Sequence, residues 1–370
     1  MRTFRRLAVS SVVVVALLAA CTSSNSSPSD SVPQPSYNPD VEGGDPSASV
    51  QVTLDAQAAC RAGKEVTGRP VRVVSTVAPI TNLIAAIAGG TNVEVRGLVP
   101  EGTNSHTFEP PPSAARTLEQ SDIVFMNGLS LEEPTRELAD ANAKGAVLCE
   151  LGTASLEPSF WLYDFSFPKE AGKPNPHLWT NPPLVLPYLT YIRDALVIAD
   201  PANGDIFDKN YVALSAQVNA LEEAMDVASA TVPVRNRKLL TYHDAYAYFA
   251  ERFEFEVIGA IQPQSFEEPS PMDVAKLIDQ VKKTGVPAIF GSEVFPSDVL
   301  EQIGKETGVR YVDVLRDDDL LGKPGDPEHS WWGLMRFNFV TMVEALGGDA
   351  SALKALEYDP TLKDDASYPQ

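Results

Sequence analysis

The sequence predicts an α/β protein of two lobes, each a parallel-sheet α/β sandwich, joined by one long backbone helix. Two observations support this fold class. Short β-branched strands alternate with helical patterns along residues 70–348, which is typical of parallel sheets. Residues 208–230 form a single helical pattern without Pro or Gly, and its apolar residues Leu214, Val218 and Leu221 recur at three- and four-residue spacing. This helix separates the two alternating halves.

The individual elements follow from the same reading. In the first half, Gly89 and Gly90 stop an early helix. We expect strands at 71–76, 93–99 and 123–126, and helices at 81–88 and 112–119. In the second half, we expect strands at 238–242, 255–259, 287–290 and 311–315, and helices from 245, 272, 298 and 331.

The N-terminus is typical of an export signal. Arg2, Arg5 and Arg6 precede the apolar stretch 7–20, which is too short for a comfortable membrane span. That stretch ends in Leu-Ala-Ala before Cys21 and looks like a bacterial lipobox, which implies cleavage before Cys21 and lipidation of its thiol. An ordinary signal peptide with a chance cysteine is the alternative. We therefore expect a protein anchored by lipid on the extracytoplasmic face of the cell membrane.

The regions expected along the chain follow from composition. Residues 22–49 are rich in Ser, Pro, Asn and Asp and cannot bury enough surface to fold, so they resemble a flexible tether. The expected divisions are a signal peptide at 1–20, a tether and disordered linker at 21–69, an N-terminal lobe at 70–206, a linking helix at 207–232, a C-terminal lobe at 233–348 and an acidic tail at 349–370.

Charge and cysteine content limit the partners. The formal net charge of −21 over 370 residues argues against binding nucleic acid, whose phosphates it would repel. Export implies an oxidising compartment, so Cys60 and Cys149 are candidates for a disulfide, with two buried thiols as the alternative. We expect a monomer.

Four histidines occur in the chain, and the positions of three of them suggest a metal site. His106 and His243 each follow a predicted strand, and His177 lies in a Pro-rich turn. Asp317 to Asp319 follow the last strand. Because ligands of open α/β sheets bind beyond the carboxyl ends of the strands, two facing lobes could bring these groups into one cleft. Three imidazoles and one carboxylate could form a tetrahedral site, in which imidazole suits zinc and carboxylate suits zinc and manganese. Any single histidine is more often a surface or hydrogen-bonded residue.

Longer motifs around these histidines resemble a known family. His106 begins HTFEP, His177 lies within NPHLW and His243 begins HDAYAYF, and the segment STVAPITNLIAAIAG precedes them. In this order, over roughly residues 70–348, they resemble the metal-binding receptors of bacterial ABC importers, the cluster A-I (cluster 9) group. The resemblance implies that the chain captures a divalent metal for the membrane permease of an ABC transporter, with zinc favoured and manganese as the alternative.

The resemblance also implies the ligands. It assigns His106, His177 and His243, and a fourth ligand from an Asp after the final strand. Reading back without a gap from Gly322 selects Asp319, whereas counting forward from Tyr311 selects Asp317. We prefer Asp319.

Three further residues lie near the proposed ligands or resemble them but are not expected to bind the metal. Glu109 and Asp244 adjoin the proposed ligands and are candidates for hydrogen-bond acceptors that orient the rings, or are simply surface carboxylates. His329 lies outside the motifs and is interpreted as a loop histidine.

Two other functions compete with metal capture. A zinc hydrolase is disfavoured because the chain has neither an H-E-x-x-H nor a G-x-S-x-G motif. A site closed by three His and one Asp also leaves no position for catalytic water. A role in surface adhesion is compatible with metal capture and stays open.

Overall fold

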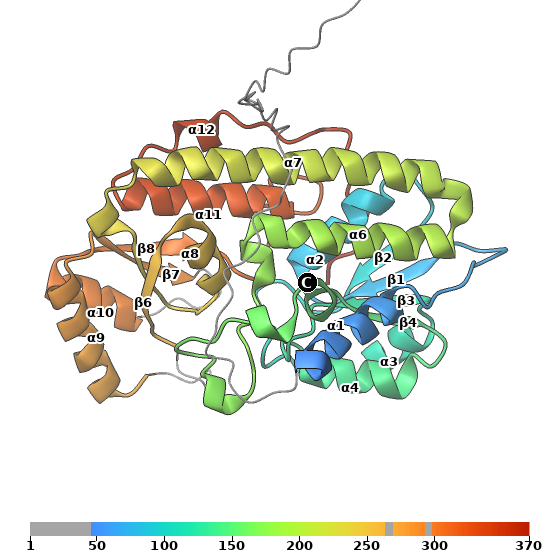
Figure 1. The fold of residues 1–370 in the computed structure, drawn as a ribbon, viewed down its shortest axis with the longest axis horizontal. Helices are drawn as coiled ribbons and strands as arrows, with labels where there is room; N and C mark the ends of the chain where they lie inside the picture. The colour runs from blue at the N-terminus through green and yellow to red at the C-terminus, as the bar shows by residue number, and fades with distance from the viewer. Residues whose placement is uncertain (1–45, 263–268, 293–297, 370) are drawn as a thin grey trace, which may run out of the picture. The chain divides into compact units, whose positions relative to one another are not determined.

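The computed structural model describes residues 46–262, 269–292 and 298–369 (Figure 1). The N-terminal lobe contains a parallel sheet with the strand order β2-β1-β3-β4. These strands are β1 (Arg72–Ser75), β2 (Glu94–Gly97), β3 (Ile123–Met126) and β4 (Val147–Glu150). β1 and β3 are the central strands, and β3 is buried along its whole length, as expected for a continuous apolar run covered by helices on both faces.

Helices cover this sheet. They are α1 (Pro46–Cys60), α2 (Ala78–Ala88), α3 (Pro112–Glu119), α4 (Glu133–Asn142), α5 (Leu151–Ser155) and α6 (Pro182–Ala199). Every residue of α2 is buried, because the helix lies between the sheet and the long helix α7. Short 3-10 helices lie between the larger elements, at Pro158–Phe160, Lys169–Ala171, Leu178–Thr180, Pro201–Asn203 and Val234–Asn236.

The long helix is α7 (Gly204–Thr231), which runs past both lobes and packs against α6, α2 and α11 (Figure 1). Its buried face includes Leu214, Val218 and Leu221, the residues whose spacing predicted it. The prediction of 207–232 therefore matches the observed helix within three residues at its start and one at its end.

The C-terminal lobe repeats the topology of the first. Its parallel sheet has the order β6-β5-β7-β8, from β5 (Lys238–Thr241), β6 (Glu256–Ala260), β7 (Ala288–Ser292) and β8 (Arg310–Leu315). Its helices are α8 (Ala247–Phe253), α9 (Pro271–Thr284), α10 (Asp298–Thr307), α11 (Trp331–Ala345) and α12 (Ser351–Lys354). The predicted fold class, two parallel α/β lobes and one long helix, is confirmed.

Two terminal regions differ from expectation. Helix α1 forms within the stretch interpreted as a tether, because buried Thr53 and Cys60 fix it to the N-terminal lobe. The segment interpreted as an acidic tail folds back onto the same lobe. There Leu362 and Tyr368 are buried, and Ser367 bonds to the backbone of β2. Mostly polar segments can therefore pack through a few apolar anchors.

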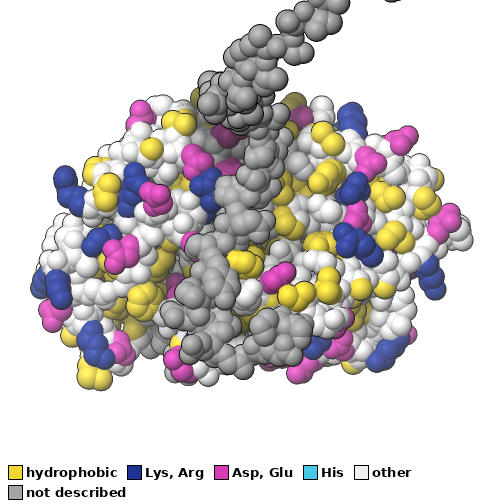
Figure 2. All heavy atoms as spheres, viewed as in Figure 1, with side chains coloured by type: hydrophobic (Ala, Val, Ile, Leu, Met, Phe, Trp, Pro, Cys, Tyr) yellow, Lys and Arg dark blue, Asp and Glu magenta, His cyan; other side chains and the backbone are white. Residues whose placement is uncertain are grey.

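Cys60 and Cys149 form a disulfide that joins the end of α1 to β4. Cys21 and the apolar stretch before it lie outside the described residues. Within the part of the chain that the structure describes, no helix is long and apolar enough to cross a membrane. On the face drawn in Figure 2, acidic and basic side chains are interspersed rather than gathered into one charged patch.

Candidate metal centre

Three histidine side chains from distant parts of the chain meet at one point. The Nε2 atoms of His106 and His177 are 3.2 Å apart, those of His106 and His243 are 3.3 Å apart, and those of His177 and His243 are 2.9 Å apart. In the described ranges, this is the one group of three or more His, Cys, Asp or Glu residues placed to hold a metal ion. The structure therefore brings together the three histidines that the sequence singled out.

Turns after the strands place these rings. His106 lies in the loop that follows β2, where its N–H donates to Asn104 Oδ1 at 2.9 Å. His177 precedes a 3-10 turn, and its N–H donates to Asn175 Oδ1 at 3.0 Å. His243 follows β5, and Thr241 Oγ1 donates to its carbonyl. Short polar side chains favour such local turns, and here each turn directs an imidazole toward the same space.

Two amide side chains fix the orientation of the rings. Asn175 Oδ1 lies 2.8 Å from His177 Nδ1, and Gln262 Oε1 lies 2.7 Å from His243 Nδ1. The Asn175 amide nitrogen donates to the Asp244 carbonyl, which leaves its oxygen for the histidine. Because an amide oxygen only accepts, the proton of each ring lies on Nδ1 and the Nε2 lone pair faces the centre.

Burial keeps the rings of His106 and His177 neutral. His177 is fully buried and His243 is 2% exposed, whereas His106 is only half-buried. Burial, and then the neighbouring rings, lower the pKa of His106 and His177 well below the usual histidine value. Neutral imidazole is the form that binds metals, so these two rings are in the protonation state that a metal ligand needs.

The three aspartates after β8 have different surroundings. The Asp319 carboxylate accepts a hydrogen bond of 2.7 Å from the Gly102 N–H, in the loop before His106. The Asp318 carboxylate accepts from Ser105 Oγ, and its other oxygen is buried without a hydrogen-bond partner. Asp317 and Asp318 both interact electrostatically with His243. The loop thus lies beside the histidines, with Asp319 turned to a backbone contact.

Burial also raises the pKa of these carboxyls. It raises the pKa of Asp317 to about 6 and that of Asp319 to about 7, and it raises the pKa of Asp318 as well. Desolvation is the leading cause for all three, because burial penalises the charged form. A bound cation would favour the charged form.

The residues suggested as ring acceptors do not have that position. Glu109 is exposed. Asp244 is buried, and its carboxylate accepts from the Ser166 N–H. It lies beside Asp164, whose pKa is raised to about 9 by burial and by the charge of Asp244. Asn175 and Gln262 were missed as the acceptors. Asn175 stands within the NPHLW motif, so that motif held a usable signal; Gln262 lies in a loop without one.

Known proteins place the fold and the site in context. The family described as zinc-uptake complex component A, periplasmic (ZnuA), matches residues 73–345. The chain belongs to the ZnuA family. It is 26% identical to the manganese-binding lipoprotein MntA of Halalkalibacterium halodurans, covering 75% of this chain and 89% of MntA. It is also 26% identical to the iron-binding protein YfeA of Yersinia pestis, covering 76% and 88%. The solved periplasmic zinc-binding protein TroA of Treponema pallidum aligns with a TM-score of 0.68 at 26% identity, covering 75% and 99%.

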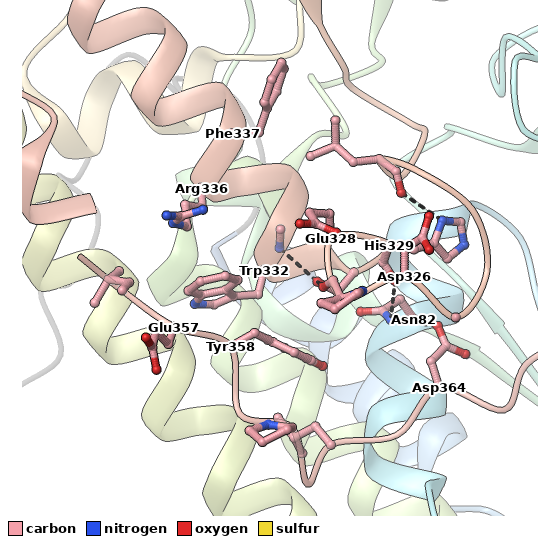
Figure 3. A pocket seen from close by; sticks show the side chains of 18 of the residues that line it. Asn82, Asp326, Glu328, His329, Trp332, Arg336, Phe337, Glu357, Tyr358 and Asp364 are labelled. Atoms are coloured by element: carbon pink, nitrogen blue, oxygen red, sulfur yellow. Dashed lines mark hydrogen bonds between the residues drawn. The ribbon is translucent and has the colours of Figure 1, made fainter. Parts of the chain in front are cut away.

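This ZnuA-family chain also has a cavity that lies apart from the histidine cluster. It has a volume of about 850 Å³ and lies between α11 and the C-terminal segment (Figure 3). His329 lines it, and the His329 Nδ1 bonds to the Leu321 carbonyl while its ring packs edge-on against Tyr368. The fourth histidine is therefore a packed loop residue, as its sequence context indicated.

Proposed function

We propose that this chain is an extracytoplasmic solute-binding protein that captures one divalent transition metal between its lobes and delivers it to an ABC importer. The observation that carries the proposal is the convergence of three Nε2 atoms within 3.3 Å of one another. Membership of the ZnuA family and the metals for which MntA, YfeA and TroA are named support it.

The spacing of the nitrogens suits a small cation. Three unprotonated nitrogens at this separation repel one another unless a positive charge lies between them. A tetrahedral zinc with Zn–N distances of about 2.0–2.1 Å holds its nitrogen ligands about 3.3–3.4 Å apart. The observed separations of 2.9 to 3.3 Å are slightly shorter, so the rings need move only a little to bind the ion.

The fourth ligand in this proposal is a carboxylate of the loop 317–319. The sequence favoured Asp319, with Asp317 as the alternative. The surroundings favour Asp317 and Asp318 over Asp319, because each of these two has one buried oxygen without a hydrogen-bond partner and interacts with His243, whereas Asp319 accepts from Gly102. Metal titrations of Asp317→Asn, Asp318→Asn and Asp319→Asn test this. The largest loss of affinity is expected for Asp317→Asn or Asp318→Asn, and the larger of these two losses identifies the ligand. A larger loss in Asp319→Asn would restore Asp319 as the ligand.

Zinc is the favoured metal, with manganese as the alternative. Three imidazole nitrogens and one oxygen suit zinc, whereas manganese prefers more oxygen donors. Relatives are named for manganese, iron and zinc, so their names do not choose among metals. Elemental analysis of protein purified without added metal should find about one zinc per chain. Manganese as the main ion would contradict the choice of zinc but leave metal capture intact.

Calorimetry tests the site itself. Wild-type protein is expected to bind one zinc ion tightly, and His177→Ala to lose that site. His329→Gln is the matched control, since it also removes a buried histidine but lies outside the cluster. Equal losses in both variants would mean that the three converging histidines are not the ligands.

Catalysis is not part of the proposal, because four protein ligands leave no open position for a reacting water. A peptidase or esterase assay of the zinc-loaded protein is expected to show no turnover. Zinc-dependent turnover lost in His177→Ala would instead favour a hydrolase.

The proposed location is the extracytoplasmic face of the membrane, where lipid on Cys21 anchors a monomer beside its permease. Cys21→Ala is expected to move the protein from the membrane fraction to the soluble fraction. A variant that stays with the membrane would contradict lipid anchoring at this residue.

A further inference from the structure

A second, smaller cavity lies directly beside the histidine cluster. It has a volume of about 390 Å³ and is lined by His106, by the turn after β3 and by the loop that leads to His177. The turn contributes residues 129–131, the start of α4 contributes 133 and 134, and the loop contributes 166, 167, 171, 173 and 174. Since His106 is half-buried while His177 and His243 are buried, the edge of the site that faces this cavity is its accessible edge.

The turn that lines the cavity has an unusual backbone. Gly128, Leu129 and Ser130 have consecutive φ values of 77°, 56° and 62°. Non-glycine residues rarely adopt this left-handed region, which costs each of them about 1–2 kcal/mol. The buried Glu132 carboxylate holds the turn by accepting from the N–H groups of Asn127 and Gly128. The surrounding structure therefore imposes this conformation, and its consequence is the placement of the next side chain, Glu133.

Opposite charges meet at the cavity. Glu133 Oε2 lies 3.3 Å from Lys173 Nζ, and both side chains are about half exposed, at 48% and 56%. Ser130 also bonds to the Glu133 carboxylate. Both charged residues line the cavity, Glu133 at the start of α4 and Lys173 in the loop, so the ion pair bridges the two segments. Since exposed ion pairs contribute about 0–1 kcal/mol to stability, this pair is weak enough to open.

An apolar wall lies on the inner side. The Phe167 ring lies 5.5 Å from the His106 ring and 5.8 Å from the His177 ring, measured between centroids, and Phe167 is 7% exposed. A hydrated cation gains nothing from that side of the cavity. The Glu133 carboxylate is the group in this cavity that can attract the cation before it reaches His106.

We propose that this cavity is the route by which the divalent cation enters the site, with Glu133 attracting the ion and Lys173 opposing it. The proposal rests on the proposed function, because it assumes that the three histidines hold the metal. In this role the Glu133–Lys173 pair sets the rate of capture without ligating the bound ion. Charges at the rim of a binding site act mainly on the association rate and its salt dependence.

Stopped-flow mixing of the metal-free chain with zinc, followed through a competing fluorescent chelator, tests this route. Glu133→Gln is expected to bind zinc about three-fold more slowly, and Lys173→Gln about three-fold faster, which is the scale of one screened unit charge acting on a divalent ion at several ångströms. Both changes should shrink as the salt concentration rises.

Glu301→Gln and Lys305→Gln are the matched controls. These residues form a similar exposed pair at 2.7 Å on α10, away from the cavity, and the substitutions make the same charge changes. Opposite shifts at Glu133 and Lys173 that exceed the shifts of the control pair support the route. Any other pattern overturns it. The zinc stoichiometry of the same samples separates the two proposals: one zinc per chain with unchanged rates overturns only the route, whereas no bound zinc overturns both.

Discussion

The two lobes have the same strand order but are secured differently. In the N-terminal lobe, β1 pairs with β2 and β3 in continuous register. In the C-terminal lobe, the register shifts between Leu239 and Leu240 and again between Phe290 and Ser292, and β5 meets β7 through the single pair Thr241 and Phe290. One topology therefore supports a regular sheet in one lobe and an irregular sheet in the other.

The N-terminal lobe is also bonded to the first described helix and to the C-terminal segment. The disulfide joins α1 to β4, and Ser367 exchanges backbone hydrogen bonds with Val95 and Gly97 of the β2 edge. This lobe supplies His106 and His177, while the C-terminal lobe supplies His243 and the aspartate loop. We infer that the N-terminal lobe is a fixed platform and that the C-terminal lobe adjusts to the ion.

The largest expected effect on zinc binding comes from removing one proposed ligand from either lobe. His106→Ala and His243→Ala should each weaken zinc binding by more than about 100-fold, the upper figure typical for loss of a residue that only orients a ligand. Calorimetry with a competing chelator measures both. If the N-terminal lobe is the fixed platform, His106→Ala should lose more zinc affinity than His243→Ala. The adjustable C-terminal lobe can replace His243 with water or another carboxylate, whereas the fixed lobe cannot replace His106. A larger loss in His243→Ala would reverse the roles of the lobes.

Most of the fold and the three clustered histidines could be predicted from local sequence patterns. The alternation of apolar strands with helical patterns predicted two parallel-sheet lobes. Three motifs predicted that His106, His177 and His243 share one site. Helix α6 was missed because its start is Pro-rich and Pro187 lies inside it. The choice among Asp317, Asp318 and Asp319 depends on contacts with Ser105 and Gly102 of the other lobe, and no local pattern encodes such contacts.

Removal of the disulfide should affect the N-terminal lobe more than the C-terminal lobe. The bridge spans 89 residues, so in the chain-entropy account its loss costs about 4.6 kcal/mol of unfolding free energy. The double variant Cys60→Ser, Cys149→Ser should therefore unfold at lower urea concentration. Hydrogen exchange measured by mass spectrometry should accelerate in β3 and β4 more than in β6 and β7. Equal acceleration in both sheets would show that the lobes unfold as one unit.

The two ring acceptors offer a matched pair, one for each lobe. Asn175→Ala and Gln262→Ala should each weaken zinc binding by about 10- to 100-fold, because the imidazoles lose the contact that fixes their tautomer. The greater loss is expected for Asn175→Ala, since Asn175 also donates to Asp164 and to the Asp244 carbonyl. Gln262→Glu keeps an acceptor at the same place and should retain affinity. If Gln262→Glu loses as much zinc affinity as Gln262→Ala, Gln262 does not act by accepting the hydrogen bond from His243.

The smallest expected effect concerns Glu132, which holds the left-handed turn in the N-terminal lobe. Burial raises its pKa to about 7 from an ordinary value of 4.5, although it accepts from Thr76, Asn127 and Gly128. Between these two pKa values the folded chain binds more protons than the unfolded chain. The Glu132 contribution to stability is therefore lost as pH rises from about 4.5 to about 7.

Glu132→Gln removes this titration while keeping an oxygen acceptor. At pH 5 the variant should be slightly less stable than wild type, because a glutamine leaves the Gly128 N–H or one of its companions without an acceptor. At pH 8 the buried charge costs only the wild type, so the gap should close or reverse by on the order of 1 kcal/mol. Urea unfolding of metal-free protein from pH 5 to pH 8 measures the difference, in which the other titrating groups cancel. A difference in unfolding free energy that is constant across this range would mean that Glu132 stays charged in the folded protein. The N–H groups of the turn would then compensate for its burial.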